Sequence, residues 1–320
     1  MKKAVGKYSI GLLLLLILAY VSLFVGVSNL DLSAFSQSDS RDLEILLAVR
    51  LPRTVSIIIA GASLSLSGLL AQHITQNRFA SPETMGTFAA GRLGLILSIF
   101  LFPGSAILSR SFFAFLFSLL GTFLFIKILD SIRLKNSMLV PVIGIIFGNI
   151  IQALGSYIAI NQDIAQEVNA WFQGSFSSLH SQNFQLILVS LLALGFIILG
   201  SHYFAVLGLG RDIATDLGVS FEKIRLISIA LIALASSAVL LTVGNIPFVG
   251  IVIPNLAAFL QGDHFQKNMG AVLLLGPIFL LFCDILARLI IAPYEIPVSI
   301  IVGVIGAGMF IFILLRGERA

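Results

Sequence analysis

The chain has 320 residues, of which 58 % are hydrophobic and only 11 % are charged, and its formal net charge is +4. A water-soluble domain of this composition would have too little polar surface, so the expected solvent is a lipid bilayer. The basic residues are scattered between apolar runs and do not form one basic face, which argues against nucleic-acid binding. The single cysteine, Cys283, lies within an apolar run, so neither an intramolecular disulfide nor a thiolate metal cluster is expected.

Long, unbroken apolar runs predict membrane-spanning helices. A helix needs roughly 20 residues to cross about 30 Å of hydrocarbon, and such runs exclude the alternating pattern of a membrane barrel. We therefore predict an all-α polytopic membrane protein, a single transmembrane domain over residues 1–320 with about ten transmembrane helices. The first run is interpreted as an uncleaved span because no signal-peptide cleavage site follows it, and the short eighth span is expected to be partly unwound. The predicted spans are 8–28, 52–72, 90–108, 111–129, 138–160, 184–204, 226–243, 248–261, 270–291 and 297–315.

Basic residues predict the orientation of these spans. With ten spans both termini share a side, and the positive-inside rule places that side in the cytosol of a bacterial cytoplasmic (inner) membrane. Thirteen of the 19 Lys and Arg residues then lie inside, and only Arg41, Arg50, Arg53 and Arg110 lie outside. Arg92 and Arg288 remain within spans.

A long cytosolic connection, residues 208–225, carries an amphipathic pattern. Its apolar residues recur about every four positions, which predicts two short surface helices, with Gly218 as a break and Ser220 as a possible cap. A merely solvated connector is the alternative. The charged residues of this pattern are Arg211, Asp212, Asp216, Glu222, Lys223 and Arg225, and its apolar residues are Ile213, Leu217, Phe221 and Ile224.

Small residues follow one face of the second span. Gly61, Ser65 and Gly68 recur at helical spacing, with Ser63 and Ser67 beside them. Small residues let membrane helices approach closely, since lipid provides no hydrophobic drive for helix pairing. Close helix packing is the commoner explanation, but Ser63 and Ser67 are also candidates to line a translocation path.

Arginines within or beside the spans need partners. Asp284 and Arg288 lie four apart on one helix face, which predicts a structural ion pair, while Arg92 has no local carboxylate and can reach the cytosolic interface. Either arginine could instead line a substrate path. Arg50 and Arg53 bracket a helix-starting proline on the outer side, where a carboxylate of a docking protein or a lipid phosphate could meet them.

No catalytic pattern is present in the sequence. There is no His-Glu-x-x-His, Gly-x-Ser-x-Gly or phosphate-binding Gly-x-x-x-x-Gly-Lys motif, so we predict no catalytic residue, metal site or cofactor. Carboxylates within the spans are almost absent, with Asp284 the main candidate, so a proton relay lacks components. Transport powered by another subunit therefore fits better than autonomous proton coupling.

An ordered set of motifs resembles the FecCD/BtuC-type permeases of type II ABC importers, which carry iron-siderophores, haem or vitamin B12. The resemblance extends from about residue 45 to the end of the chain. It rests on Arg50-Leu-Pro-Arg53, Ala60-Gly61-Ala62, Ser67-Gly68, Ala80-Ser81-Pro82, Gly86, Trp171, Gly174-Ser175, Leu209-Gly210, Leu217-Gly218, Gly244-Asn-Ile-Pro-Phe248-Val-Gly250, Pro254, Asp284-Ile-Leu-Ala-Arg288 and Glu295-Ile-Pro297.

The resemblance implies the BtuC-like permease fold and a set of partners. It implies a translocation path between two permease subunits, two cytosolic ABC ATPase subunits and an extracytoplasmic substrate-binding protein. It matches Arg50, Arg53 and Arg288 to arginines that receive glutamates of the binding protein, with Asp284 orienting Arg288. It identifies 208–225 as the loop that couples to the ATPases.

Departures from the common family pattern bear on the substrate. Asn77-Arg78-Phe79-Ala80 replaces Asn-Pro-Leu-Ala, and the stretch Ser81 to Thr87 is most similar to the anguibactin, enterobactin and petrobactin branch. The resemblance therefore implies ferric siderophores of catecholate type, moved by alternating access, with the iron kept inside its chelate and a second, often different, permease as partner. The alternatives are haem or cobalamin import, an ion-coupled secondary transporter and a membrane-embedded enzyme.

Overall fold

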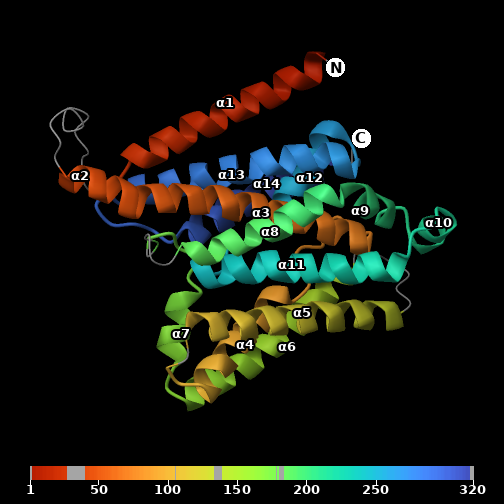
Figure 1. Ribbon diagram of the computed structural model, residues 1–320, viewed down its shortest axis with the longest axis horizontal. Coiled ribbons are helices and arrows are strands. Elements are labelled where there is room, and N and C mark those ends of the chain that lie inside the picture. The colour runs from red at the N-terminus through yellow and green to blue at the C-terminus, as the bar shows by residue number, and fades with distance from the viewer. Residues whose placement is uncertain are drawn as a thin grey trace.

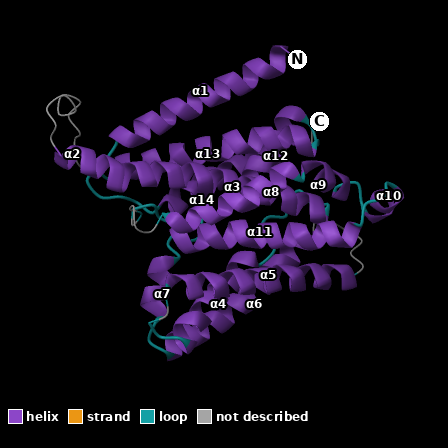
Figure 2. Cartoon of the chain, viewed as in Figure 1, coloured by secondary structure: helices purple, strands orange, loops and turns teal. Residues whose placement is uncertain are grey.

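A computed structural model describes residues 2–26, 40–104, 106–132, 139–177, 179 and 184–317. Regular structure throughout these residues is helical (Figures 1 and 2), which confirms the predicted all-α class. The helices are α1 Lys2–Phe24, α2 Ser40–Ile45, η2 Leu46–Arg50, α3 Leu51–Thr75, α4 Thr87–Leu101, α5 Ile107–Ser131, α6 Leu139–Asn161, α7 Ala165–Trp171, α8 Gln185–Leu199, α9 Ser201–Leu207, α10 Arg211–Asp216, α11 Phe221–Val243, α12 Val249–Gln261, α13 Phe265–Leu289 and α14 Val298–Gly317.

Each predicted span overlaps at least one helix, but the span 184–204 covers both α8 and α9, and the span 90–108 runs beyond the end of α4 into the start of α5. In the described part of the chain, six helices are long and apolar enough to cross a membrane, and the pair α8 and α9, bent by 73° at Gly200, would make a seventh. Three further apolar helices, Tyr8–Phe24, Thr87–Leu101 and Val249–Gln261, are shorter. The total of ten spans therefore depends on these three and stays a prediction.

Helix α3 forms the centre of the bundle. Its most apolar window is 89 % buried, and it packs against α8, α11, α12 and α13. A Cβ added to Gly61 would lie 2.6 Å from the backbone of Gly276, and one added to Gly68 would lie 1.9 Å from the carbonyl oxygen of Gly250. The small residues of the second predicted span therefore permit close backbone packing.

Helices α6 and α14 are the least covered of the six long apolar helices in the described part of the chain. Only 17 % of the most apolar window of each is buried. In α6 the exposed side chains include Ile146, Ile150 and Leu154. These faces require lipid or another apolar partner, since water would not cover them favourably.

Helix α12 is a discontinuous element. It begins only at Val249, after a non-helical stretch in which Gly244 and Phe248 both have positive φ, +92° and +66°. Gly68 meets Gly250 deep in the bundle, so this stretch carries the chain inward before the helix starts. The predicted span 248–261 is therefore helical from Val249 to Gln261, and the non-helical stretch lies before it, so the expectation that the span itself is partly unwound is not confirmed.

The bundle has two distinct ends (Figure 1). Helices α2 and α7 lie at one end and α10 lies at the other, together with the start of α1 and the end of α14. The first is called the arginine end below, for Arg50, Arg53 and Arg288, and the second the α10 end.

Candidate functional site

Arg53, near the start of α3, joins two carboxylates at the arginine end. Its Nη2 donates to Asp284 Oδ1 at 2.8 Å, and its Nη1 donates to both carboxylate oxygens of Glu295, at 2.9 and 2.8 Å. Asp284 lies on α13 and is fully buried, whereas Glu295 lies between α13 and α14 and remains 22 % exposed. Arg53 thus links α3 to Asp284 and Glu295, which lie 11 residues apart in the C-terminal part of the chain.

Arg288 and Arg50 bind the C-terminal end of α1. Arg288 pairs with Asp284 at 2.5 Å, and its Nη1 donates to the carbonyl oxygens of Ser22 and Val25 at 2.9 and 2.6 Å. Arg50 Nη1 donates to the carbonyl oxygens of Leu23 and Phe24 at 2.8 and 3.1 Å. Cations are favoured at a helix C-terminus, where backbone carbonyls lack intrahelical partners and the helix dipole is negative.

The three predicted docking arginines therefore lie together, but two of them face inward. Arg50 and Arg288 are each only 6 % exposed, and the Arg53 side chain is 11 % exposed. Three arginines against Asp284 and Glu295 leave this group of five with a net charge of +1. The contacts of Arg53 were not predicted, and the Glu295-Ile-Pro297 motif was the only signal for Glu295.

The α10 end has exposed charges and exposed apolar side chains. Helix α10 ends at a left-handed Gly218 (φ +75°), where Val219 N–H donates to Ala214 O at 2.9 Å, as in a Schellman motif. Leu209, Ile213 and Leu217 are 54, 50 and 60 % exposed. Asp212, Asp216 and Lys223 are also exposed, and Arg211 pairs with Glu222 at 2.6 Å.

The predicted pair of surface helices needs correction. Only α10 is a separate short helix, and the second is the first turn of α11, because the apolar pattern continues without a break into that span. Ser220 occupies the N-cap position of α11 but makes no side-chain cap hydrogen bond. Gly218 is a break, as predicted.

The C-terminal end of α3 packs against the connection that precedes α10. A Cβ added to Gly208 would lie 2.6 Å from His73 Cδ2, and one added to Gly210 would lie 2.9 Å from Gln76 Nε2. Arg53 lies near the other end of α3. One buried helix therefore contacts both candidate surfaces.

The two serines proposed for a path lie inside the bundle. Ser63 and Ser67 are both 0 % exposed, and Ser63 Oγ donates to Ser190 Oγ of α8 at 2.9 Å. The path assignment for these serines is corrected, because their helix face points toward neighbouring helices. They pack between helices, as the alternative interpretation held.

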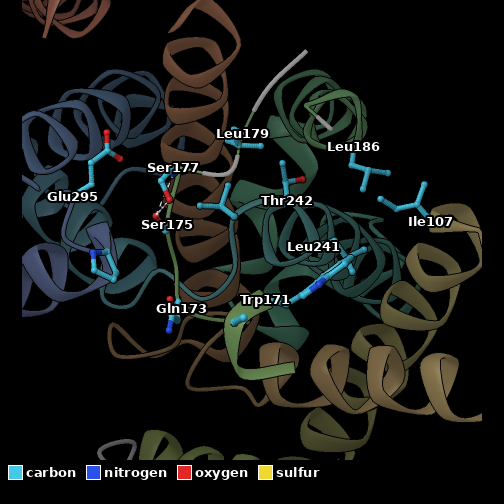
Figure 3. A pocket seen from close by; sticks show the side chains of 13 residues that line it. Ile107, Trp171, Gln173, Ser175, Ser177, Leu179, Leu186, Leu241, Thr242 and Glu295 are labelled. Carbon is cyan, nitrogen blue, oxygen red and sulfur yellow. Dashed lines mark hydrogen bonds between the residues drawn. The ribbon is translucent and has the colours of Figure 1, made fainter. Parts of the chain in front are cut away.

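A cavity of about 600 Å³ lies beside the arginine end (Figure 3). Glu295 stands at one side of it and Ile107 at the other, with Ser175 and Ser177 hydrogen-bonded to each other at 2.9 Å between them. Trp171 and Thr242 also line it. The segment after α7 that carries Ser175 and Ser177 is held by two backbone hydrogen bonds. Ser175 N–H donates to Val243 O and Ser299 N–H donates to Gly174 O, both at 3.0 Å.

A second, smaller cavity of about 250 Å³ contains Arg92. Arg92 Nη2 donates to Asn169 Oδ1 at 2.8 Å, and the guanidinium lies over the Phe172 ring, 5.1 Å from its centroid. Both partners belong to α7 and the residues after it, at the arginine end. Arg92 therefore points away from the α10 end, and the expectation that it reaches the cytosolic interface is corrected.

Four polar residues of this second cavity were missed from the sequence. Asn149 and Gln152 interrupt an apolar span and could have been noticed for that reason; Glu83 and Asn245 lie in non-helical segments. No group of three or more metal-ligating side chains occurs among the residues that the structure describes.

Comparisons with known proteins bear on the whole chain. The model of the FecCD transport family matches residues 13–316. The chain belongs to the FecCD transport family. The family that the motifs resembled is thus confirmed.

Relatives of this FecCD chain match over nearly their full length. It is 39 % identical to the petrobactin import system permease protein YclN of Bacillus subtilis, over 95 % of this chain and 96 % of that protein. It is 36 % identical, with the same coverage, to the ferric-anguibactin transport system permease protein FatD of Vibrio anguillarum. An inward-facing metal-chelate type ABC transporter has a similar structure, with a TM-score of 0.83, 27 % identity and coverage of 97 % of this chain and 99 % of that chain.

Proposed function

We propose that this FecCD chain is the permease subunit of an ATP-driven importer of ferric siderophores of the catecholate type. The observation that carries the proposal is the nearly full-length similarity to permeases for petrobactin and ferric anguibactin. The chain crosses a bacterial cytoplasmic membrane about ten times, with both termini in the cytosol, and forms a single transmembrane domain. It binds no catalytic cofactor, and iron crosses within its chelate.

Two ABC ATPase subunits bind the α10 end in this proposal. The coupling surface is formed within residues 208–225, with Leu217 as its apolar contact and Arg211, Asp212, Asp216, Glu222 and Lys223 around it. Support comes from the exposure of Ile213 and Leu217, which would be unfavourable in water without a partner. Gly218 sets the turn that holds α10 away from α11.

An extracytoplasmic binding protein docks at the arginine end. Arg53 receives a carboxylate of that protein, which replaces Glu295, since Glu295 is the more exposed of its two partners. Arg50 and Arg288 do not contact the docked protein in this proposal. They hold the C-terminal end of α1 and add positive charge beneath the docking surface. Asp284 orients both Arg53 and Arg288.

A second permease subunit, identical or related, completes the path. Its contact surface is formed by faces of α6 and α14, which are the least buried of the six long apolar helices in the described part of the chain. The path lies between the two subunits and includes Arg92. Alternating access then follows when ATP-driven movement at the α10 end is transmitted along α3 to the arginine end.

Uptake of radiolabelled iron tests the proposal. Cells that lack their own siderophore permeases should gain uptake of ferric petrobactin when this chain is expressed with its cognate permease, ATPase and binding protein. Uptake should disappear with an ATPase that binds but does not hydrolyse ATP. Uptake that persists with that ATPase would instead indicate ion-coupled transport, and uptake of haem or cobalamin alone would overturn the siderophore assignment.

A substitution at the α10 end sharpens this test. Leu217→Asp should abolish uptake and ATPase co-purification, because a charge cannot replace an apolar contact in a buried interface. Leu217→Met, which keeps the contact apolar, is the matched control and should retain uptake. Wild-type uptake by Leu217→Asp would remove Leu217 from the coupling surface.

A further inference from the structure

The small cavity around Arg92 is lined by polar side chains from several segments and opens at the protein surface along α6. Its walls come from the turn before α4, from α4 and α6, and from the non-helical stretch before α12. Glu83, Arg92, Asn149, Gln152 and Asn245 line it, together with the aromatic rings of Phe88 and Phe172. Such a combination of aromatic and polar groups is typical of a ligand site.

The cavity opens on the uncovered face of α6. Asn149 and Gln152 lie near the middle of this 23-residue helix and are exposed. Amides at that depth are costly against lipid tails, where they find no hydrogen-bond partners. This part of α6 therefore faces a water-containing path and not hydrocarbon.

Two buried polar atoms at the cavity have no partner. Arg92 Nε and Asn245 Oδ1 are both buried and make no hydrogen bond within the described residues. A buried donor or acceptor that stays unsatisfied costs about 1–3 kcal/mol, so each such atom calls for an explanation. Both atoms are covered by protein, so a ligand in the cavity would contact the exposed part of the Arg92 side chain and not these two atoms.

Glu83 is already bound by the protein. Its Oε2 accepts the backbone N–H of Phe248 at 3.2 Å, at the start of α12, and the Asn245 side chain also hydrogen-bonds to this carboxylate. A carboxylate is favoured at a helix N-terminus because the helix dipole is positive there. Arg92 is therefore the charged side chain of this cavity that is left to bind a ligand, and it selects anions.

The volume limits the ligand to one arm of a chelate. A cavity of about 150 Å³ holds benzene, and whole drug-sized ligands need about 300–1,000 Å³. The present 250 Å³ fits one substituted aromatic ring. Phe88 and Phe172 offer stacking surfaces, and Arg92 offers a guanidinium for oxygen atoms at the edge of that ring.

We propose that this cavity binds one catecholate arm of the ferric chelate during its passage, with Arg92 binding the ring oxygens and Asn149 and Gln152 completing the polar contacts. The inference rests on the proposed function and adds the chemical group and the residues that select it. A ferric ion with three catecholates is strongly anionic, whereas one with three hydroxamates is neutral. Arg92 thus favours the former by charge.

Arg92→Gln tests the contact directly. In proteoliposomes that contain this chain, its cognate permease and the ATPase, with binding protein and ferric petrobactin added outside, Arg92→Gln should lower initial uptake at least about tenfold. That factor corresponds to one charge-assisted hydrogen bond. Arg92→Lys should recover part of the rate.

A purely structural role for Arg92 predicts a different pattern. Asn169→Ala removes the protein partner of Arg92 but keeps the cation, so it should leave uptake near the wild-type rate. If Asn169→Ala lowers uptake as much as Arg92→Gln does, Arg92 only anchors α7 and the proposal fails.

Filling the cavity gives an independent test without a change of charge. Gly148 lines it, and a Cβ at this position would lie 3.7 Å from its nearest neighbour, which is ordinary contact. Gly148→Leu should therefore block uptake while ATPase activity and assembly persist, whereas Gly195→Leu in α8, outside the cavity and with nothing within 4 Å of an added Cβ, is the control that should transport normally. Wild-type uptake by both Gly148→Leu and Arg92→Gln would overturn this proposal and leave the proposed function standing. If the wild type moves no ferric petrobactin, both fail.

Discussion

The arginine end and the α10 end use similar ion pairs in opposite ways. Arg53 and Arg288 share Asp284 in a setting where that carboxylate is 0 % exposed, whereas Arg211 and Glu222 pair with 66 and 60 % of their side chains exposed. Water screens the second pair and not the first. The comparison teaches that charges at the arginine end hold helices together, while those at the α10 end remain free to meet a partner.

Among the substitutions that test this comparison, removal of the Asp284 carboxylate should cause the largest loss of stability. Asp284→Ala leaves Arg53 with one partner and Arg288 with no carboxylate, in a buried region, so we expect a loss of about 3–5 kcal/mol of stability. Thermal and denaturant unfolding of the purified chain in detergent measures this loss. Asp284→Asn keeps the shape and should recover part of it; a wild-type midpoint for Asp284→Ala would show that the cluster does not stabilise the fold.

The next largest loss of stability is expected in α3, the helix that runs between the two ends. In Gly68→Ala the new Cβ would lie 1.9 Å from the carbonyl oxygen of Gly250, so α3 and α12 must separate, at an expected cost of about 1–3 kcal/mol. The same unfolding measurement applies. Gly195→Ala in α8, where an added Cβ meets nothing within 4 Å, is the matched control and should be neutral or slightly stabilising. Equal midpoints for the two variants would contradict the close approach.

The smallest effect is expected at the α10 end. Glu222→Gln removes the partner of Arg211 on the surface, and exposed pairs contribute at most about 1 kcal/mol. The unfolding midpoint should therefore change little, and its difference from the wild-type midpoint should shrink further as salt is added. A loss of stability as large as that of Asp284→Ala would erase the distinction between the two ends.

Sequence patterns predicted the helices well because apolar runs specify spans without any knowledge of neighbours. They also placed Arg50, Arg53 and Arg288 at one end, since each flanks or ends a span. They did not predict that Arg53 would reach Asp284, because these residues are 231 positions apart and nothing local links them. Ser63 and Ser67 were misjudged as path residues for the same reason.

The polar cavity was beyond sequence analysis for a different physical reason. Glu83 lies in a connection that folds back against the start of α12, and hydropathy treats every polar connection as a surface loop. Asn149 and Gln152 were visible as amides within an apolar run, but their exposure depends on which face of α6 remains uncovered. The helical class follows from composition; the orientation of each helix face follows only from packing.

The shared carboxylate of Asp284 also constrains how such a protein can evolve. Loss of Asp284 removes the carboxylate partner of the buried Arg288 and leaves Arg53 with Glu295 alone, whereas loss of Arg53 releases Glu295, which already reaches water at 22 % exposure. The order in which the four residues Arg53, Asp284, Arg288 and Glu295 are substituted therefore matters for stability. Arg53 and Glu295 can be replaced first with a modest loss of stability, although the proposed docking contact of Arg53 is then lost. Asp284 becomes dispensable for the fold only after Arg288 has also changed, so Asp284 should be the last of these residues to be substituted.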